Sequence, residues 1–137
     1  MYAKIMVPVD LAHVDRLTKA IDTATDLAKR YQIPVCFVGV TPSAPSPVAH
    51  NPQEFARKLD AFAQAQGAEH GLDAGSAAYI SDDPAVDLDR TLMDAIAEQG
   101  ADLVVMASHI PGLPEYLFHS NAGHLAAHAK VSVFVVR

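Results

Sequence analysis

The fold is decided by residues 101–137, ADLVVMASHIPGLPEYLFHSNAGHLAAHAKVSVFVVR. Two runs in this stretch, LVVM at 103–106 and VFVV at 133–136, are apolar at every position instead of alternating. Continuous apolar runs are typical of strands that are covered on both faces. A loop follows the first run, and HSNAGHLAAH at 119–128 predicts a helix that opens near Ser120. This order of strand, loop, helix and strand favours a parallel pair joined by a crossover helix.

The same alternation extends to the rest of the chain. Further β-branched runs lie at residues 4–9, 34–40 and 76–81. Apolar residues at three- and four-residue intervals predict helices within 17–31, 51–71 and 82–102. The pattern predicts an α/β fold in which a doubly wound, five-stranded parallel sheet has helices on both faces.

Capping residues mark the ends of the expected helices. Asp15 is a candidate cap for the first helix, and Asn51, followed by Pro52, is one for the second. The carboxylates of SDDPAVDLD at 81–89 are interpreted as caps in the favourable field of a helix N-terminus, with cation binding as the alternative. Gly100 is a natural C-terminal cap.

Length and charge narrow the function classes. With 137 residues, half of them apolar, the chain is expected to form one domain, residues 1–137. The net charge is −6, and the sequence has no block of basic residues, so nucleic acid and anionic membrane surfaces are not expected partners. Neither a signal peptide nor a membrane-spanning run is visible, which predicts a cytoplasmic protein without membrane insertion. Cys36, the single cysteine, is expected to pack as a small apolar side chain.

The proline-rich segment TPSAPSPVAHNP at 41–52 predicts an exposed excursion after the second strand. A lid, a partner surface and a long connection all remain open for it. In a doubly wound sheet, ligands bind beyond the carboxyl ends of the strands, where the winding direction reverses. The first strand brings Pro8, Val9 and Asp10 to that edge, and the fourth brings Ala107, Ser108 and His109.

Three segments carry a resemblance to a known family: KIMVPVDLA at 4–12, ADLVVMASH at 101–109 and SNAGHLAAHAKVSVFVVR at 120–137. They resemble the universal stress protein family, in particular its short, single-domain bacterial members. The resemblance implies strand order 3-2-1-4-5 and a homodimer made through the last strand. In one branch of the family it also implies an adenine nucleotide pocket at the switch point, whereas other branches bind no nucleotide.

The nucleotide-binding branch carries a Gly-x2-Gly-x9-Gly-Ser/Thr signature, which combines backbone N–H groups with a helix N-terminus around the phosphates. Here Ala107 replaces the first glycine, Gly112 is the only glycine of the loop, and His119 stands in place of the last glycine. An imidazole at 119 either fills the space of a phosphate or donates a hydrogen bond to it. Ser120 and Asn121 either meet an anion or simply cap the helix.

The resemblance implies that Asp10 lies near the adenosine end of the nucleotide and that Val9 and Val40 border its adenine. The alternative role for Asp10 is to cap the turn that follows it. Together with the strand-end positions, this gives a full set of expected nucleotide-binding residues: Pro8, Val9, Asp10, Val40, Met106, Ala107, Ser108, His109, Gly112, His119, Ser120 and Asn121.

The function expected from these residues is a small, dimeric stress-response module that binds ATP, ADP or AMP, with or without Mg²⁺, and signals by occupancy to an unknown protein partner. The alternative is an interaction module of the same family that binds no nucleotide. No Walker lysine motif or nucleophile–base pair is visible, so no enzyme activity is expected beyond a slow ATPase. His124 and His128 have metal-ligand spacing, but no glutamate or cysteine accompanies them, so no metal site is predicted. The final strand, lying at an edge of the sheet, predicts a dimer centred on residues 133–135.

Overall fold

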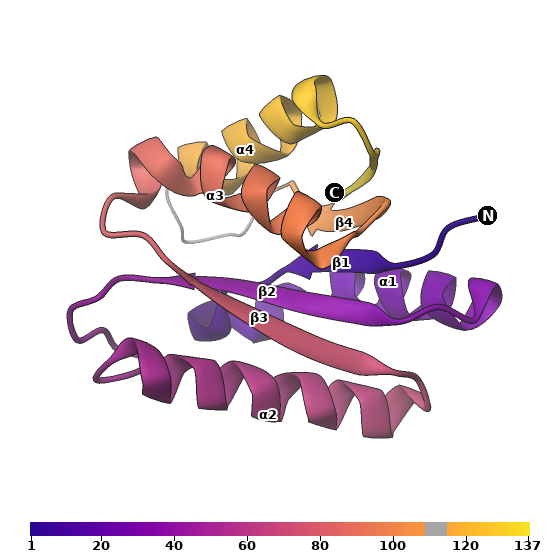
Figure 1. The fold of residues 1–137 in the computed structure, drawn as a ribbon, viewed down its shortest axis with the longest axis horizontal. Helices are drawn as coiled ribbons and strands as arrows, with labels where there is room; N and C mark the ends of the chain where they lie inside the picture. The colour runs from indigo at the N-terminus through magenta and orange to yellow at the C-terminus, as the bar shows by residue number, and fades with distance from the viewer. Residues whose placement is uncertain (109–114) are drawn as a thin grey trace.

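The computed structural model describes residues 1–108 and 115–137, with the side chains of 84–85 and 115–121 left aside. A parallel sheet of five strands, in the order β3-β2-β1-β4-β5, forms the centre of the molecule (Figure 1). The strands are β1 (Ile5–Pro8), β2 (Val35–Thr41), β3 (Ala74–Ile80), β4 (Leu103–Ala107) and β5 (Ser132–Val136). The helices are the 3-10 helix η1 (Leu11–Arg16), α1 (Thr18–Tyr31), α2 (Pro52–His70), α3 (Pro84–Gln99) and α4 (Glu115–His128). The predicted fold class and strand order are therefore confirmed.

Helices cover both faces of the sheet, as the continuous apolar runs predicted. Helices α1 and α2 pack on one face, where Ile5 and Val7 of β1 join their core, and α3 and α4 pack on the other face with Met6 (Figure 1). Successive strand residues thus enter different cores, because side chains alternate across a strand. No position of β1 is left to water, which explains why its sequence does not alternate.

Helix α2 begins and ends where its sequence predicted. Asn51 occupies the N-cap position, its Oδ1 accepts the N–H of Glu54 at 2.8 Å, and Pro52 opens the helix. Gly71 ends it with a φ of 65°, a left-handed conformation that glycine adopts without steric cost. Gly100 ends α3 in the same way.

The expected cap of α1 was wrong. The N-cap residue is Leu17, not Asp15, because η1 runs directly into the helix. The last turn of η1 is closed by the Leu17 N–H, which donates to the Val14 carbonyl at 2.9 Å. The chain therefore enters α1 already in a helical turn. Asp15 contributes only its main-chain carbonyl, which accepts from the Thr18 hydroxyl at 3.2 Å.

The expected start of α4 also differs from the structure. The helix begins at Glu115, five residues before Ser120. Pro114 precedes Glu115 in the sequence. Negative charge is favourable in a first helical turn because of the helix dipole, so the acidic Glu115 is a sequence signal for this earlier start. The capping tendency of Ser120 and Asn121 had suggested the later one.

Of the helices within the described residues, none is long and apolar enough to cross a membrane. Cys36 is a free, buried cysteine, and burial raises the pKa of its thiol. Its Sγ lies 3.6 Å from Oε1 of Gln99, whose Nε2 donates to the Tyr79 hydroxyl at 3.2 Å. A buried thiol with a raised pKa forms little thiolate, so the structure agrees with a packing role for Cys36.

Candidate functional site

The candidate residues of β1 and β4 lie at the carboxyl edge of these two central strands. β1 and β4 are neighbours, and the sheet grows from β1 toward β2 on one side and from β4 toward β5 on the other. Open parallel sheets bind ligands at this reversal of winding. Backbone pairing continues beyond both strand ends: the Val9 N–H donates to the Val38 carbonyl at 2.8 Å, and the Ser108 N–H to the Val136 carbonyl at 2.9 Å. The backbone on both sides of the switch point, at Val9 and Ser108, is therefore fixed by hydrogen bonds to the neighbouring strands.

Most of the candidate residues on these two strands are buried. Val9 is 5% exposed, Met106 1%, Ala107 8% and Ser108 5%, and Pro8 is buried as well. Val40, near the end of β2, is only half-buried. Because these side chains are buried, a ligand at this edge would meet mainly their main-chain N–H and C=O groups. These positions therefore supply little charge.

Asp10 is the charged residue that follows β1, and the structure gives it the capping role that the sequence left open. Its Oδ1 accepts the Ala12 N–H at 3.0 Å, and its Oδ2 lies 3.0 Å from Nδ1 of His13. The side chain is 26% exposed. Because a carboxylate has about four lone-pair positions, two hydrogen bonds leave Asp10 able to accept from a hydroxyl of a ligand. The turn thus holds the carboxylate in place at the carboxyl edge of the sheet.

The loops that follow β2 and β3 are tied to each other at the same edge. Oδ1 of Asp82 accepts both the Ser43 N–H and the Ser43 hydroxyl, each at 2.7 Å. These hydrogen bonds favour the ionised carboxyl and lower the pKa of Asp82. The expectation that this carboxylate caps α3 was therefore wrong, because Ser43 presents two donors to it.

The remaining candidate residues follow β4. His109 and Gly112 lie outside the described residues. His119, Ser120 and Asn121 lie in α4, and only their backbone is described. Ser120 is the sixth residue of this helix, so an anion site built on a helix N-terminus at Ser120 does not match the structure.

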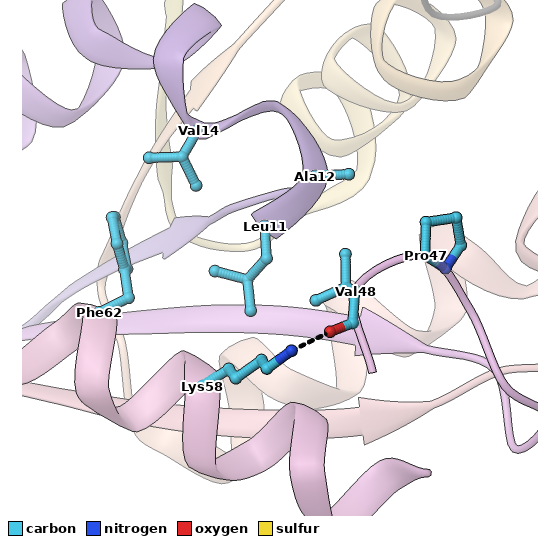
Figure 2. Close-up of a pocket in the computed structure, with 7 residues that line it drawn as sticks. All are labelled: Leu11, Ala12, Val14, Pro47, Val48, Lys58 and Phe62. Carbon is cyan, nitrogen blue, oxygen red and sulfur yellow. Dashed lines mark hydrogen bonds between the residues drawn. The ribbon is translucent and has the colours of Figure 1, made fainter. Parts of the chain in front are cut away.

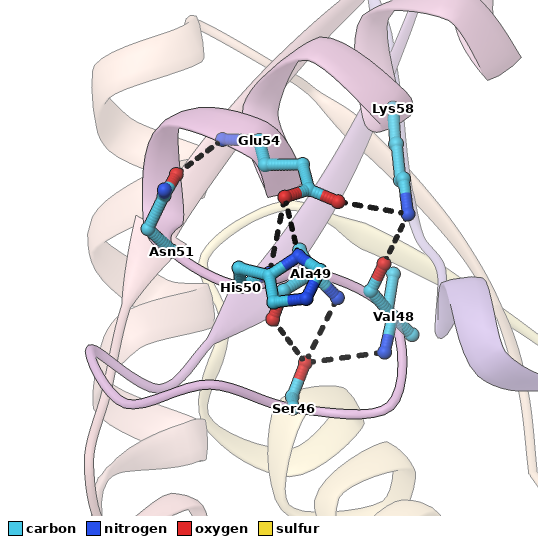
Figure 3. Close-up of polar contacts among 7 residues, drawn as sticks. All are labelled: Ser46, Val48, Ala49, His50, Asn51, Glu54 and Lys58. Carbon is cyan, nitrogen blue, oxygen red and sulfur yellow. Dashed lines mark hydrogen bonds and ion pairs between the residues drawn. The ribbon is translucent and has the colours of Figure 1, made fainter.

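Polar contacts fix the second half of the β2–α2 connection against α2 (Figure 3). Glu54 is their centre: Oε1 lies 3.1 Å from Nζ of Lys58, while Oε2 accepts from the His50 N–H at 3.2 Å and lies 3.0 Å from His50 Nδ1. Lys58 also donates to the Val48 carbonyl. Ser46 closes the turn, its hydroxyl oxygen accepting the Val48 and Ala49 N–H groups at 3.3 Å.

These hydrogen bonds, first those of the His50 side chain and then that of Lys58, lower the pKa of Glu54 to about 2. This network was not predicted from the sequence. A signal was present, because Asn51 and Glu54 have the spacing of a capping box and Lys58 follows Glu54 by one helical turn. The connection at 46–51 is therefore anchored to α2, as a long structured turn would be.

A groove of about 570 Å³ lies beside this connection, between η1 and α2 (Figure 2). Leu11, Val14, Val48 and Phe62 give it apolar walls, and Lys58 lies at its border, bonded to the Val48 carbonyl. None of the expected nucleotide-binding residues lines it. The groove therefore shares no lining residue with the expected nucleotide site at the switch point.

Within the described ranges, no group of three or more His, Cys, Asp and Glu side chains is placed to hold a metal ion. The carboxylates at 81–89 are separated by their partners: Asp82 bonds to Ser43, Asp87 to Arg90 at 3.2 Å, and Asp89 to His124 at 3.1 Å.

Solved structures share this architecture. A universal stress family protein from Burkholderia pseudomallei is 25% identical, with a TM-score of 0.70 over 98% of this chain and 96% of that one. An Archaeoglobus fulgidus universal stress protein, solved in complex with dAMP, is 18% identical, with a TM-score of 0.69 over 99% of this chain and 98% of that one. At 18% identity, the second likeness shows the fold alone.

Sequence comparison agrees with the fold. Universal stress protein G of Salmonella typhimurium is 30% identical over 145 residues, covering 100% of both chains. The model of the universal stress protein family matches residues 1–137. The short segments at 4–12, 101–109 and 120–137 that suggested the resemblance are thus part of a match over the whole chain. The chain belongs to the universal stress protein family.

Proposed function

We propose that this chain binds an adenine nucleotide at the carboxyl edge of its sheet and that occupancy of the site is its signal. The observation that carries the proposal is the position of Asp10, held by its own turn at the switch point between β1 and β4. Val40, half-buried near the end of the neighbouring strand β2, offers an apolar side chain for adenine, and the carboxylate accepts from ribose hydroxyls. The dAMP complex of the Archaeoglobus fulgidus protein, which has the same fold, supports a nucleotide as the ligand.

Of ATP, ADP and AMP, the monophosphate AMP fits the residues of this chain best. Ala107 and His119 replace two glycines of the phosphate-wrapping signature, which leaves Gly112 as the only glycine of the loop. Ser120 lies inside α4. Fewer backbone N–H groups at a helix start mean weaker stabilisation of a long phosphate chain. The proposed function is therefore binding without turnover, with AMP at least as good a ligand as ATP.

The second candidate is an interaction module that binds no nucleotide. It is favoured by the same departures at Ala107 and His119 and by the existing hydrogen bonds of Asp10, which satisfy the carboxylate without a ligand. In this case the dimer and partner surfaces alone would carry the signal within the cytoplasm.

Calorimetry of the purified protein with ATP, ADP and AMP, with and without Mg²⁺, separates the two candidates. Nucleotide binding predicts saturable heat with at least one of them, and mass spectrometry of freshly purified protein is expected to find co-purified nucleotide. Absence of both heat and bound nucleotide at high protein concentration would establish the second candidate instead.

Asp10→Ala tests the site itself. Loss of one hydrogen bond to a ligand weakens binding by about 0.5–1.5 kcal/mol, or more for a charged acceptor, so we expect an affinity several-fold lower. Asp15→Ala, which removes an exposed carboxylate five residues away, serves as the matched control and should bind normally. Unchanged affinity in a folded Asp10→Ala protein would remove Asp10 from the site.

The proposed signalling unit is a homodimer that pairs through β5. This strand lies at an edge of the sheet, where β4 is its one partner among the described strands, and Phe134 on it is 46% exposed. An exposed apolar edge strand invites pairing, and pairing with its symmetry mate satisfies both copies. Val133 and Val135 remain half-buried in the monomer and would be covered further.

A charge in β5 tests the dimer. We expect Val135→Asp, and more mildly Phe134→Asp, to convert a dimer to a monomer in light scattering at tens of micromolar. Ile80→Asp places the same charge at an exposed position of the opposite edge strand, β3, and should leave the mass unchanged. A wild-type chain that is monomeric in this range would contradict the proposed assembly.

A further inference from the structure

Two histidines lie one helical turn apart on α4, next to α3, which shares the same face of the sheet (Figure 1). The rings of His124 and His128 are stacked, with centroids 4.2 Å apart and planes inclined by 22°. Both residues are exposed, while Ala122 and Leu125 of the same helix are buried. The pair therefore lies on the open flank of α4 and not in its packed face.

Oxygen acceptors lie beside Nδ1 of both rings and favour a proton on that nitrogen. Nδ1 of His124 lies 3.1 Å from Oδ2 of Asp89, and Nδ1 of His128 lies 3.0 Å from the main-chain carbonyl of His124. An ionised carboxylate and a carbonyl oxygen only accept hydrogen bonds, so Nδ1 is the donor in each case. In a neutral imidazole the other nitrogen then has no proton. Both rings thus present the lone pair of Nε2.

This is the arrangement that metal-binding histidines need. A histidine ligand almost always donates its second ring N–H to a carboxylate or a backbone carbonyl, which orients the ring and increases its basicity. His124 has the first kind of partner and His128 the second. Asp89 comes from α3, and its other oxygen, Oδ1, is buried with no hydrogen-bond partner among the described residues. Its negative charge is therefore directed largely to the His124 ring.

We propose that His124 and His128 form a surface site for a borderline divalent transition-metal ion, such as Zn²⁺, Ni²⁺ or Cu²⁺, with Asp89 as a positioning residue. Imidazole nitrogen suits these ions, whereas Mg²⁺ and Ca²⁺ prefer oxygen ligands. The i, i+4 spacing places both rings, and with them both Nε2 atoms, on one helix face. With two protein ligands, the ion keeps positions for water or for a further ligand.

The spacing alone did not justify this site at the level of sequence, because most histidine pairs are simply solvated. The structure adds the two acceptors at Nδ1, one of which comes from a different helix. An ion held by α4 through a ring that is bonded to α3 would also strengthen the contact between these helices. Since the ion binds only the folded arrangement, it should raise the unfolding temperature.

Titration of the chelator-treated protein with Zn²⁺ and Ni²⁺, in competition with a chromophoric chelator, tests the proposal. We expect His124→Ala and His128→Ala each to weaken binding at least about tenfold. His70→Ala, at the end of α2, is the matched control and should bind as the wild type does. Binding that survives in the His124→Ala/His128→Ala double variant, or no binding by the wild type, would overturn the site.

Two further measurements keep the test independent of variant folding. Long-range ¹⁵N NMR of the metal-free wild type should show the Nδ1-protonated tautomer for both neutral rings; an Nε2-protonated tautomer at either residue would overturn the proposal. Asp89→Asn, which loses the charge, should weaken metal binding about tenfold, while copper EPR still shows two imidazole nitrogens. An unchanged affinity in Asp89→Asn would overturn its positioning role.

Discussion

Helices α2 and α3 begin with the same local pattern, a polar residue followed by proline, yet their first residues form different contacts. Asn51 accepts the N–H of Glu54 at 2.8 Å and so caps α2. Asp83 holds the equivalent position of α3, but its side chain makes no capping hydrogen bond to any described backbone N–H. The neighbouring Asp82 accepts instead from Ser43, which lies in the loop after β2.

The difference teaches that this pattern locates a helix start without fixing the partner of its side chain. Proline at the first position and the change from extended to helical backbone are local properties. The acceptor role of Asp82 depends on Ser43, 39 residues away in the sequence, and so on the parallel pairing of β2 with β3. The start of α2 is stabilised locally, whereas the start of α3 is held through the fold.

The largest effect on stability is expected from a substitution that disturbs the packing of α2 against β2. A Cβ added to Gly39 of β2 would lie 2.8 Å from Cζ and 2.9 Å from Cε1 of the Phe55 ring, which is 4% exposed and has little room to move. Overpacking of this kind costs about 1–3 kcal/mol. We therefore expect Gly39→Ala to lower the free energy of unfolding by that amount in urea denaturation.

Gly75→Ala is the matched control for this prediction. Gly75 lies on the adjacent strand β3, and no described heavy atom lies within 4 Å of its added Cβ. The substitution should therefore leave stability nearly unchanged or slightly raised, since alanine loses less backbone entropy on folding. Equal losses in the two variants would show that strand propensity, and not the contact with Phe55, sets the cost.

The next prediction addresses the two helix starts directly. Loss of an N-cap side chain costs about 0.5–2 kcal/mol, so Asn51→Ala should destabilise the protein by about 1 kcal/mol. Asp83→Ala removes a side chain at the same position without a capping bond and should stay within about 0.5 kcal/mol of wild type. The check is the urea midpoint of both variants at constant m-value. If Asp83→Ala costs as much as Asn51→Ala, the comparison between α2 and α3 fails.

Much of the fold was predictable because its signals are local or repeated. The continuous apolar runs at 103–106 and 133–136 and the helical spacing between strands indicated a parallel sheet covered on both faces. The strand order followed from the family resemblance. The start of α4 was predicted five residues late, because Ser120 and Asn121 are strong capping residues and their local signal favours a later start. Asp15 was assigned as a cap because the sequence does not reveal that η1 continues into α1.

The candidate site was predictable to a smaller extent. Strand ends brought Asp10, Val9 and Ser108 to one edge, as the rule for doubly wound sheets requires. The partners of Asp10 within its own turn, and the contact between Asp82 and Ser43, depend on loop conformations that apolar periodicity does not encode. The Glu54 network was encoded by spacing, but it was hidden in a proline-rich segment that suggested only an irregular excursion.

The smallest effect concerns pH at the start of α2. The carboxyl of Glu54 has its pKa lowered to about 2 by His50 and Lys58, against about 4.3 in an unfolded chain. A group whose pKa is lowered by folding stabilises the folded state fully above its unfolded pKa. That contribution is lost as pH falls from about 4.3 to about 2. The loss should be smaller than that of Asn51→Ala, since the site is exposed and solvent screens its charges.

Glu54→Gln isolates this contribution. The variant keeps the shape of the side chain but cannot ionise, so it should be less stable than wild type at pH 7 and nearly equal to it at pH 2. Urea midpoints of both proteins, measured from pH 7 to pH 2, give the difference directly. Carboxylates elsewhere, including Asp82, titrate in both proteins and cancel in the comparison. A difference that stays constant down to pH 2 would show that the amide disturbs the turn at His50 itself, and that the charge of Glu54 contributes nothing to the start of α2.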